Sequence, residues 1–411
     1  MITHFFSRSK VLSRIQCGPL GPYLDGFARH LSDKGYSRYS GGLRIRLVAD
    51  FSRWLERRRT DVKALAEQEV TDFLSCRRKR LRANLADEPT LAILLQYLRR
   101  VGTIPEPPPA RSTPLDLIVQ DYAEFLSVER GLMQVTVENY LGEIRRFLLD
   151  RFGKKTIALD KLRPKDVSEF LIRDTTSSSL PRVQLMTCAL RSFLSYLYQA
   201  GKLAANLASS VPSVANRRSS DLDQALEPKQ VEQLLLSCDQ AAILGRRDYA
   251  VLLLLARLGL RGGEVVNLTL DDIDWEAGEL LIRGKGARQD RLPMRQDVGQ
   301  ALATYLKKGR PSCACRQVFL RNRAPRQGFH DSTAIRSIVD RALTRAGLHP
   351  KHRGSHLLRH SLGTNMLRNG SSLTQIGQIL RHERTKTTEI YAKVDRSSLQ
   401  ALTLPWPGGN R

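Results

Sequence analysis

The stretch HLLRHSLGTNMLRNG, residues 356–370, determines how the rest of the sequence is interpreted. In a helix, residues three and four positions apart share a face. One face would therefore collect His356, Arg359, His360 and Gly363. The adjoining apolar stripe would be Leu358, Leu362 and Met366. Asn369-Gly370 is a helix stop, and Ser371 or Ser372 can cap a second short helix. A polar face on an anchored helix indicates a functional site.

The next polar segment adds His382 and Tyr391. An arginine fork suits phosphate oxygens, and histidines can donate hydrogen bonds to them or move protons. A neutral tyrosine, with a pKa near ~10, is a weak nucleophile, but neighbouring cations favour its phenolate. Together these groups predict attack on a phosphodiester without a metal ion.

Composition indicates a partner that carries many negative charges. The 411 residues suggest two or three domains, and a formal charge of +25 is typical of proteins that bind nucleic acid. No apolar run approaches a membrane span, and no signal peptide is evident. The six cysteines are mostly isolated, which favours a reducing cytoplasm. Cys313-Ala-Cys315 lacks a second pair, so free thiols are expected there and not a zinc site.

Two linkers divide the chain into three expected domains. The segment IPEPPPARSTP, residues 104–114, cannot continue a helix, and VPSVANRRSSD, residues 211–221, is a polar linker. They separate a basic helical domain at 1–105, a second helical domain at 112–212 and a third domain at 222–411. The basic runs at 57–59 and 77–80 are either phosphate contacts or a solvated helix face.

The first two domains resemble copies of one unit. FARHLSDKG, residues 27–35, parallels YAEFLSVERG, residues 122–131, and LLQYLRRVG, ending at Gly102, parallels FLSYLYQAG, ending at Gly201. Between these two pairs of segments, Phe51 corresponds to Phe147, and VTDFL at 70–74 corresponds to VSEFL at 167–171. Such an ordered series of matches favours duplication over chance apolar spacing.

The third domain is expected to be mainly α-helical with a small antiparallel β-sheet. LEPKQVEQLL begins a helix with proline in its first turn, and RDYAVLLLLARLG is a buried helix ending near Gly259. ELLIRGKGARQDRLPM, residues 279–294, reads as two strands around a turn that projects Lys285. QVFL, residues 317–320, is a candidate short strand.

Five motifs in this domain carry a family resemblance. LGLRGGEV, RGKG, HLLRH, LRH and TTEIY occur in the order and approximate spacing of the tyrosine recombinase (phage-integrase-type) catalytic domain. Each motif is weak alone, whereas five in order are specific. The resemblance covers residues 222–394, and residues 115–210 look like the family's helical core-binding domain. The final segment looks like members carried by mobile elements.

The resemblance implies a role for each catalytic position. Arg261 and Arg359 would clamp the scissile phosphate, and Lys285 would protonate the leaving 5′ oxygen. His356 and His382 would hydrogen-bond the phosphate or assist proton transfer. Tyr391 would attack and form a 3′-phosphotyrosyl intermediate. No cofactor or metal is expected, and Leu357 stands where a zinc site of the HExxH type needs glutamate. His360 and Glu264 are interpreted as supporting or structural residues.

Two positions depart from the family pattern. LRGGE replaces the commoner LRxSE, which changes a neighbour of the catalytic arginine. LRHE replaces LGH, so Arg381 stands where a glycine is usual. Arg381 either adds a phosphate contact or only alters the loop. Neither change removes a catalytic group.

The sequence therefore predicts a site-specific DNA recombinase or integrase, the transposase of a mobile element. Its expected partners are double-stranded DNA and three further copies in a tetramer on two DNA sites, with related recombinases or DNA-bending proteins as possible accessories. Leu399, Leu402, Leu404 and Trp406 could form the face that docks on a neighbour, or pack on their own domain. The alternatives are a type IB topoisomerase and a catalytically inactive DNA-binding protein. The extra basic domain could lengthen the footprint, bind a second DNA site or mediate protein contacts.

Overall fold

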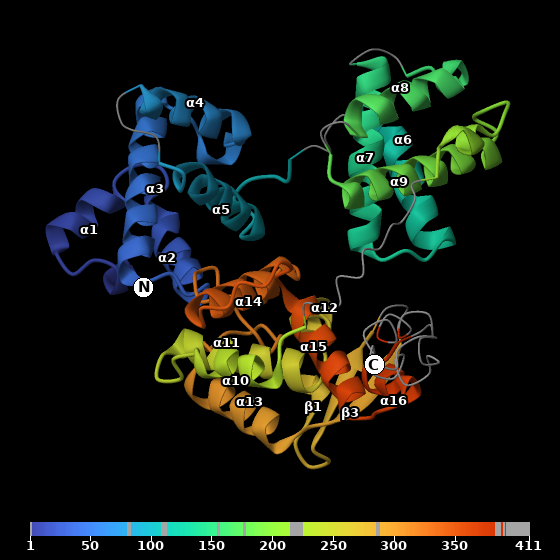
Figure 1. Ribbon diagram of the computed structural model, residues 1–411. Coiled ribbons are helices and arrows are strands. Elements are labelled where there is room, and N and C mark those ends of the chain that lie inside the picture. Colours follow the sequence, from blue (N-terminus) through green and yellow to red (C-terminus); the bar gives the residue numbers. More distant parts are fainter. Residues whose placement is uncertain are drawn as a thin grey trace, which may run out of the picture. The chain divides into compact units, whose positions relative to one another are not determined.

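The computed structural model describes residues 2–79, 84–107, 113–153, 157–175, 178–213, 225–284 and 288–382, together with 388 and 391. The chain divides into two compact units. One is Pro107–Arg218, and the other combines Met1–Glu106 with Ser219–Arg411. Figure 1 colours the N-terminal region blue, the middle region green and the C-terminal region yellow to red. Each of the three regions has a large hydrophobic core of its own. The described chain is mainly helical, with one small antiparallel sheet, as the sequence predicts.

The N-terminal region is a helical bundle built around buried aromatic and aliphatic side chains. Its helices are α1 (Ser9–Gln16), α2 (Leu24–Asp33), α3 (Arg38–Arg58), α4 (Glu67–Arg78) and α5 (Asp87–Arg100). The side-chain oxygen of Ser37 accepts from the Ser40 amide at 3.2 Å and so caps α3. Phe27 and Phe51 are fully buried in the core. Burial of such rings is the main stabilising contribution in a bundle of this size.

Where the structure describes the middle region, it is built from four α-helices. Its helices are α6 (Pro114–Glu124), α7 (Gln134–Phe152), α8 (Pro164–Thr175) and α9 (Leu180–Gln199), with one π-helical turn at Phe125–Glu129. Thr113 caps α6 reciprocally with Asp116, and Pro114 occupies the first turn. Tyr122, Phe147 and Phe193 are fully buried between these helices.

The C-terminal region packs helices around α11 and carries the sheet. The elements are α10 (Pro228–Leu236), α11 (Ile243–Arg257), α12 (Gly262–Asn267), β1 (Ile273–Asp274), β2 (Glu279–Arg283), β3 (Gln289–Pro293), α13 (Gln296–Lys308), α14 (Thr333–Arg345), α15 (Ser355–Arg368) and α16 (Leu373–Ile379). The described residues of the three regions also form short 3₁₀ turns, at Ile2–His4, Gly21–Tyr23, Val62–Ala64, Leu159–Lys161, Leu207–Ser210 and Leu270–Asp272. The strands form an antiparallel sheet in the order β1-β2-β3.

Local sequence signals account for most of these boundaries. Helix α15 begins after Gly354 and ends at Arg368; its C-cap is Asn369, which is followed by Gly370 with φ +83°. Ser372 then caps α16 by accepting from the Gln375 amide at 3.2 Å. Residues 317–320 were expected to form a strand, but they make only isolated bridges, Thr269 to Gln317 and Leu320 to Gly328. In the described part of this region, no neighbouring strand is long enough to extend either bridge into a β-ladder.

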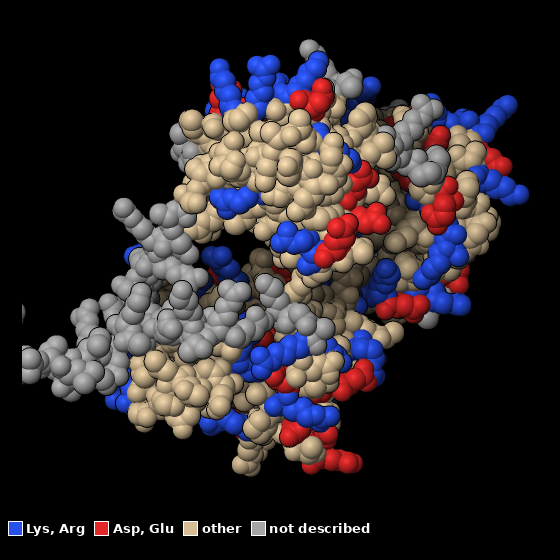
Figure 2. Space-filling view, turned by 90° about the vertical axis from the view of Figure 1, so that its right-hand side faces the viewer, with Lys and Arg blue, Asp and Glu red and all other residues tan. Residues whose placement is uncertain are grey.

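Charged side chains of both signs cover the surface. On the face drawn in Figure 2, Lys and Arg are interspersed with Asp and Glu and do not form one continuous basic patch. Many arginines form ion pairs, for example Arg77 with Asp50, Arg146 with Asp174 and Arg257 with Glu232, so the net charge alone does not identify a DNA-binding face. Within the described residues, no helix is both long and apolar enough to cross a lipid bilayer.

Candidate active site

The site starts where α11 ends. Gly259 has φ +58°, a conformation that favours glycine, and it turns the chain so that Arg261 becomes the N-cap of α12. The Arg261 backbone amide donates to Glu264 Oε2 at 2.8 Å, and its Nη1 donates to Glu264 Oε1 at 2.8 Å. The Arg261 side chain keeps 38% of its surface exposed. Glu264 thus holds the backbone amide and Nη1 of Arg261, while part of the guanidinium faces solvent.

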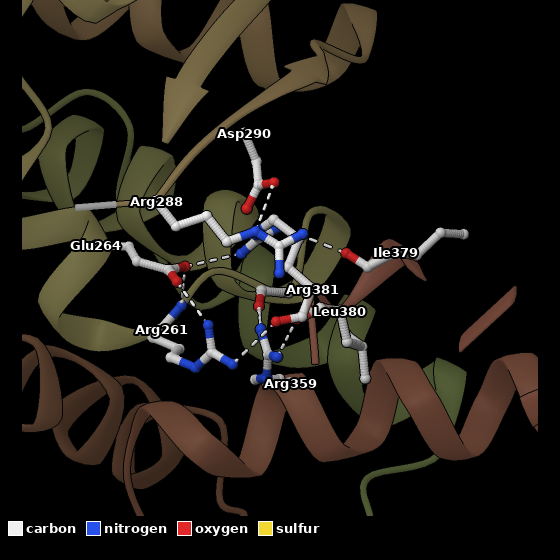
Figure 3. A network of polar contacts seen from close by, with 9 residues as sticks. Arg261, Glu264, Arg288, Asp290, Arg359, Ile379, Leu380 and Arg381 are labelled. Atoms are coloured by element: carbon white, nitrogen blue, oxygen red, sulfur yellow. Dashed lines mark hydrogen bonds and ion pairs between the residues drawn. The ribbon is translucent and has the colours of Figure 1, made fainter. Parts of the chain in front are cut away.

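Arg359 enters the same place from α15. It is buried, and its two terminal nitrogens donate to the carbonyl oxygens of Gly259 and Leu380 (Figure 3). The guanidinium therefore links the end of α11 to the end of α16. Because carbonyl groups carry no formal charge, these contacts fix the orientation of Arg359 without neutralising it.

A third arginine, Arg381, completes the cluster (Figure 3). Its Nη2 donates to Glu264 Oε2 at 2.7 Å, and its backbone carbonyl accepts from Arg261 Nη2 at 3.3 Å. Both members of the Arg381–Glu264 pair are buried, with side chains 4% and 6% exposed. One carboxylate is thus shared by two guanidinium groups.

The cluster is strongly electropositive. Burial and the charges of Arg261 and Arg381 lower the pKa of the Arg359 guanidinium to about 10, which still leaves it charged at neutral pH. Burial alone would raise the pKa of Glu264, but the charge of Arg381 and the hydrogen bonds from Arg261 outweigh it and lower that pKa. An ionised Glu264 therefore sits beside cationic arginines, an arrangement that can bind a phosphate.

The histidines around the cluster are neutral. Displacement of water by surrounding protein, together with the charges of Arg359 and Arg261, lowers the pKa of His356, although its side chain remains solvent-accessible. Burial and the same two arginines lower the pKa of His382 to about 4. His382 Nδ1 lies 2.8 Å from Thr388 Oγ1, which fixes the ring. Neutral rings can donate one hydrogen bond and accept another.

Tyr391 reaches the site but is fully buried. Its hydroxyl lies 3.1 Å from His360 Nδ1, and its ring packs on Gly363, where a Cβ atom would be 2.6 Å from Tyr391 Cζ. Neighbouring cations were expected to favour its phenolate, and Arg359 acts in that direction, but burial outweighs it in the free protein. Burial raises the pKa of Tyr391 to about 12, and the opposing effect of Arg359 is smaller.

Most of the expected site residues come together in one place. Arg261, His356, Arg359, His382 and Tyr391 are linked by the contacts and charges described above. Lys285 and residues 399–406 lie outside the described residues. His360 was interpreted as a supporting or structural residue and Arg381 was left with two alternatives, whereas Thr388 was not singled out; the partner of each depends on a tertiary contact. The described residues contain no group of three His, Cys, Asp or Glu side chains arranged to hold a metal ion.

Comparison with known proteins decides the family. The model of the Phage integrase family matches residues 224–398, and that of the Phage integrase N-terminal SAM-like domain matches residues 119–201. Across 407 residues, covering 98% of this chain and 99% of the relative, the sequence is 41% identical to y4rA of Sinorhizobium fredii, whose name assigns it to the integrases and recombinases. The chain belongs to the phage integrase family of tyrosine recombinases.

Other relatives agree with this assignment. The tyrosine recombinase XerD of Mycobacterium tuberculosis is 31% identical over 315 residues, which cover 72% of this chain and 98% of XerD. The structure of the XerH recombinase in a post-cleavage complex with difH has the same fold, with a TM-score of 0.55 and 19% identity over 81% of this chain and 93% of XerH. The protein is a tyrosine-type site-specific recombinase, of the class that cleaves and religates DNA. Its middle region is the SAM-like core-binding domain.

Proposed function

We propose that this recombinase cuts DNA through Tyr391 at a phosphate held by Arg261 and Arg359. The observation that carries the proposal is the convergence of these two arginines on neighbouring carbonyl groups. Arg359, from a helix interior, donates to Gly259 and Leu380, and Arg261, at a helix N-terminus, donates to Arg381. Arg359 contacts only carbonyl groups among these partners, and Arg261 shares the carboxylate of Glu264 with Arg381, so positive charge remains for the phosphate. Charge fixed in advance stabilises a transition state in which negative charge accumulates.

The proton transfers can be assigned to named groups. The Tyr391 oxygen forms a bond to phosphorus as the bond to the 5′ oxygen breaks, giving a 3′-phosphotyrosyl enzyme and a 5′-hydroxyl. His360, 3.1 Å from the Tyr391 hydroxyl, is placed to accept its proton once the phosphate's negative charge raises the histidine pKa. Lys285 supplies the proton to the leaving oxygen, and His356 and His382 hydrogen-bond the phosphate. In sequence Lys285 lies between Arg283 and Gln289, the pair that closes the β2–β3 hairpin.

The biological role proposed is that of an integrase or transposase of a mobile element, acting as a tetramer on two DNA sites. The full-length similarity to an integrase/recombinase supports this role. The integrase of transposon Tn1549 has the same fold, with a TM-score of 0.50 and 20% identity over 69% of this chain and 98% of that one. A type IB topoisomerase is disfavoured by the match to a core-binding domain of integrases.

The test is a suicide substrate, a nicked duplex carrying the native element end. The wild-type protein should form a complex that survives SDS, and Y391F should form none. If Y391F still forms the complex, the nucleophile is another residue. K285A should cleave a substrate with a good 5′ leaving group and fail on ordinary DNA. Relaxation of plasmids that lack the site, with no joining of two DNAs, would instead identify a topoisomerase.

We also propose that residues 1–105 are a second core-binding unit. The sequence matches place equivalent aromatic pairs in both regions. Ring centroids are 4.9 Å apart for Phe51 and Phe73, and 5.3 Å apart for their counterparts Phe147 and Phe170. A second pair, Phe27 and Tyr97 at 5.7 Å, has the counterparts Tyr122 and Tyr196 at 5.3 Å.

Backbone conformations at the helix ends support the same duplication. Gly35 and Gly131 have φ +79° and +57°, and Gly102 and Gly201 have φ +72° and +69°. After the matching helices α3 and α7, Arg59 has φ +54° and Gly153 has φ +63°. A positive-φ residue after each of the matching helices is more than apolar spacing alone would produce.

This duplication implies a longer DNA footprint. Hydroxyl-radical footprinting of the full chain should show protection beyond the length covered around the cleavage site. The double variant R57Q/R59Q should lose this outer protection and keep the inner one. Equal loss of both zones would show that the first unit does not bind DNA separately from the rest of the chain.

A further inference from the structure

Arg381 has a backbone conformation that an arginine rarely adopts. Its φ is +52°, and among the described residues only Arg59 is another non-glycine with positive φ. The left-handed conformation brings a Cβ atom too close to the backbone, which is why glycine is favoured there. A residue that retains such strain at a site is a candidate for a functional role, provided that its side chain makes contacts which compensate for it.

The side chain of Arg381 does make such contacts. Its guanidinium is buried and donates to Glu264 Oε2 at 2.7 Å. The same oxygen accepts the Arg261 backbone amide at 2.8 Å, while Oε1 accepts Arg261 Nη1 at 2.8 Å. Arg381 also reaches Arg261 through its own carbonyl, at 3.3 Å. Arg381 therefore contacts the catalytic arginine both directly and through Glu264.

This geometry changes the charge available at Arg261. With Arg381 absent, Glu264 and Arg261 would form a one-to-one ion pair of zero net charge. With Arg381 present, two guanidinium groups share one carboxylate and the trio carries a net positive charge. At close range and partly shielded from water, one unit of charge has a large effect on an approaching phosphate.

We propose that Arg381 is a positioning residue that takes up part of the charge of Glu264 and so leaves Arg261 available to the scissile phosphodiester. The inference rests on the proposed role of Arg261. It predicts that the loss of Arg381 slows cleavage because the whole negative charge of Glu264 then acts on Arg261. Removal of the negative charge of Glu264 should then restore activity, which a loop defect would not allow.

The experiment compares four full-length proteins on the suicide substrate under single-turnover conditions: wild type, R381G, R381G/E264Q and R261A. Glycine suits φ +52°, so R381G removes the guanidinium without straining the loop. R381G should cleave roughly 10- to 100-fold more slowly at saturating DNA, with less than about threefold change in half-saturating DNA concentration. R381G/E264Q should cleave at least several-fold faster than R381G.

A conservative variant and two controls exclude folding effects. R381K keeps the charge and should retain more activity than R381G. R257Q removes a partly buried arginine of α11 that pairs with Glu232 and Asp297, and it should leave cleavage unchanged. R59G relieves the same backbone strain elsewhere, and its effect on Tm shows how much the relief of strain contributes to the stability of R381G.

The outcomes separate the two proposals. If R381G cleaves like the wild type, or if R381G/E264Q is no faster than R381G, the positioning role is wrong. The second result would mean that Arg381 touches the phosphate itself or only shapes the loop. If R261A cleaves like the wild type, the proposed role of Arg261 fails, whatever the Arg381 variants do.

Discussion

The hydroxyl of Tyr391 lies 3.1 Å from Nδ1 of His360, in a position from which solvent is excluded. The partner ring has a pKa of about 4 and that of the tyrosine is about 12, so both are neutral at pH 7. A neutral phenol is a poor nucleophile. The free recombinase therefore holds Tyr391 in an unreactive state. The position and the negative charge of a bound DNA phosphate must convert Tyr391 to a reactive state.

Gly363 controls whether Tyr391 can occupy this position. In G363A the new methyl group would lie 2.6 Å from Tyr391 Cζ and 2.8 Å from its hydroxyl oxygen, so the ring must move. We expect a loss of about 1–3 kcal/mol in the free energy of unfolding. Denaturation in urea checks this. The matched variant G263A, where a Cβ atom meets nothing within 4 Å, should lose no stability.

Acid should destabilise the recombinase through its buried histidines. The pKa values of His360 and His382 fall from 6.5 in the unfolded chain to about 4 in the folded protein. Between these pH values the unfolded chain binds more protons, so stability decreases as the pH falls from 6.5 towards 4. The effect is on the order of 1–3 kcal/mol. Denaturation midpoints at pH 7 and pH 5 should differ less for H360N than for wild type. H330N, at an exposed histidine, should follow the wild-type difference.

Glu264 should matter more to stability when Arg381 is present. E264Q leaves the buried Arg381 guanidinium without its counter-charge, which costs about 3–5 kcal/mol for a buried pair. The double variant R381G/E264Q removes both charges and should lose less. The free energies of unfolding of the two variants decide the matter, and a double variant less stable than E264Q contradicts the expectation.

The two basic runs of the N-terminal region should behave differently. Arg57 is exposed, whereas Arg77 is 23% exposed and donates to Asp50 and Asp87, both at 3.1 Å. R57Q should reduce the slope of log affinity for DNA against log salt by about 1. R77Q should instead lower the free energy of unfolding by about 1–2 kcal/mol, because Asp87 and Asp50 both lose a partly buried arginine partner, although Asp50 keeps its pair with Arg53. Salt titrations of DNA binding and urea denaturation distinguish the two effects.

Features that depend on neighbouring residues could be predicted from the sequence. The spacing of His356 and Arg359 defines a helical face, and Asn369-Gly370 ends that helix, so α15 was predicted almost to the residue. The following polar segment added Tyr391, and the family motifs added Arg261 and Lys285. Contacts between distant segments could not be predicted: His360 meets Tyr391 across 31 positions, and Arg381 meets Glu264 across 117. The raised pKa of Tyr391 follows from burial, which exists only in the folded domain.

The contacts of Arg359 also have a consequence for protein synthesis. Its guanidinium needs acceptors at Gly259 and Leu380, which leave the ribosome far apart in time. Until Leu380 has emerged, the arginine lacks one acceptor, and the cationic cluster cannot assemble. A nascent chain therefore has no complete phosphate site, and a truncated product that ends before residue 380 should be unable to nick the chromosome.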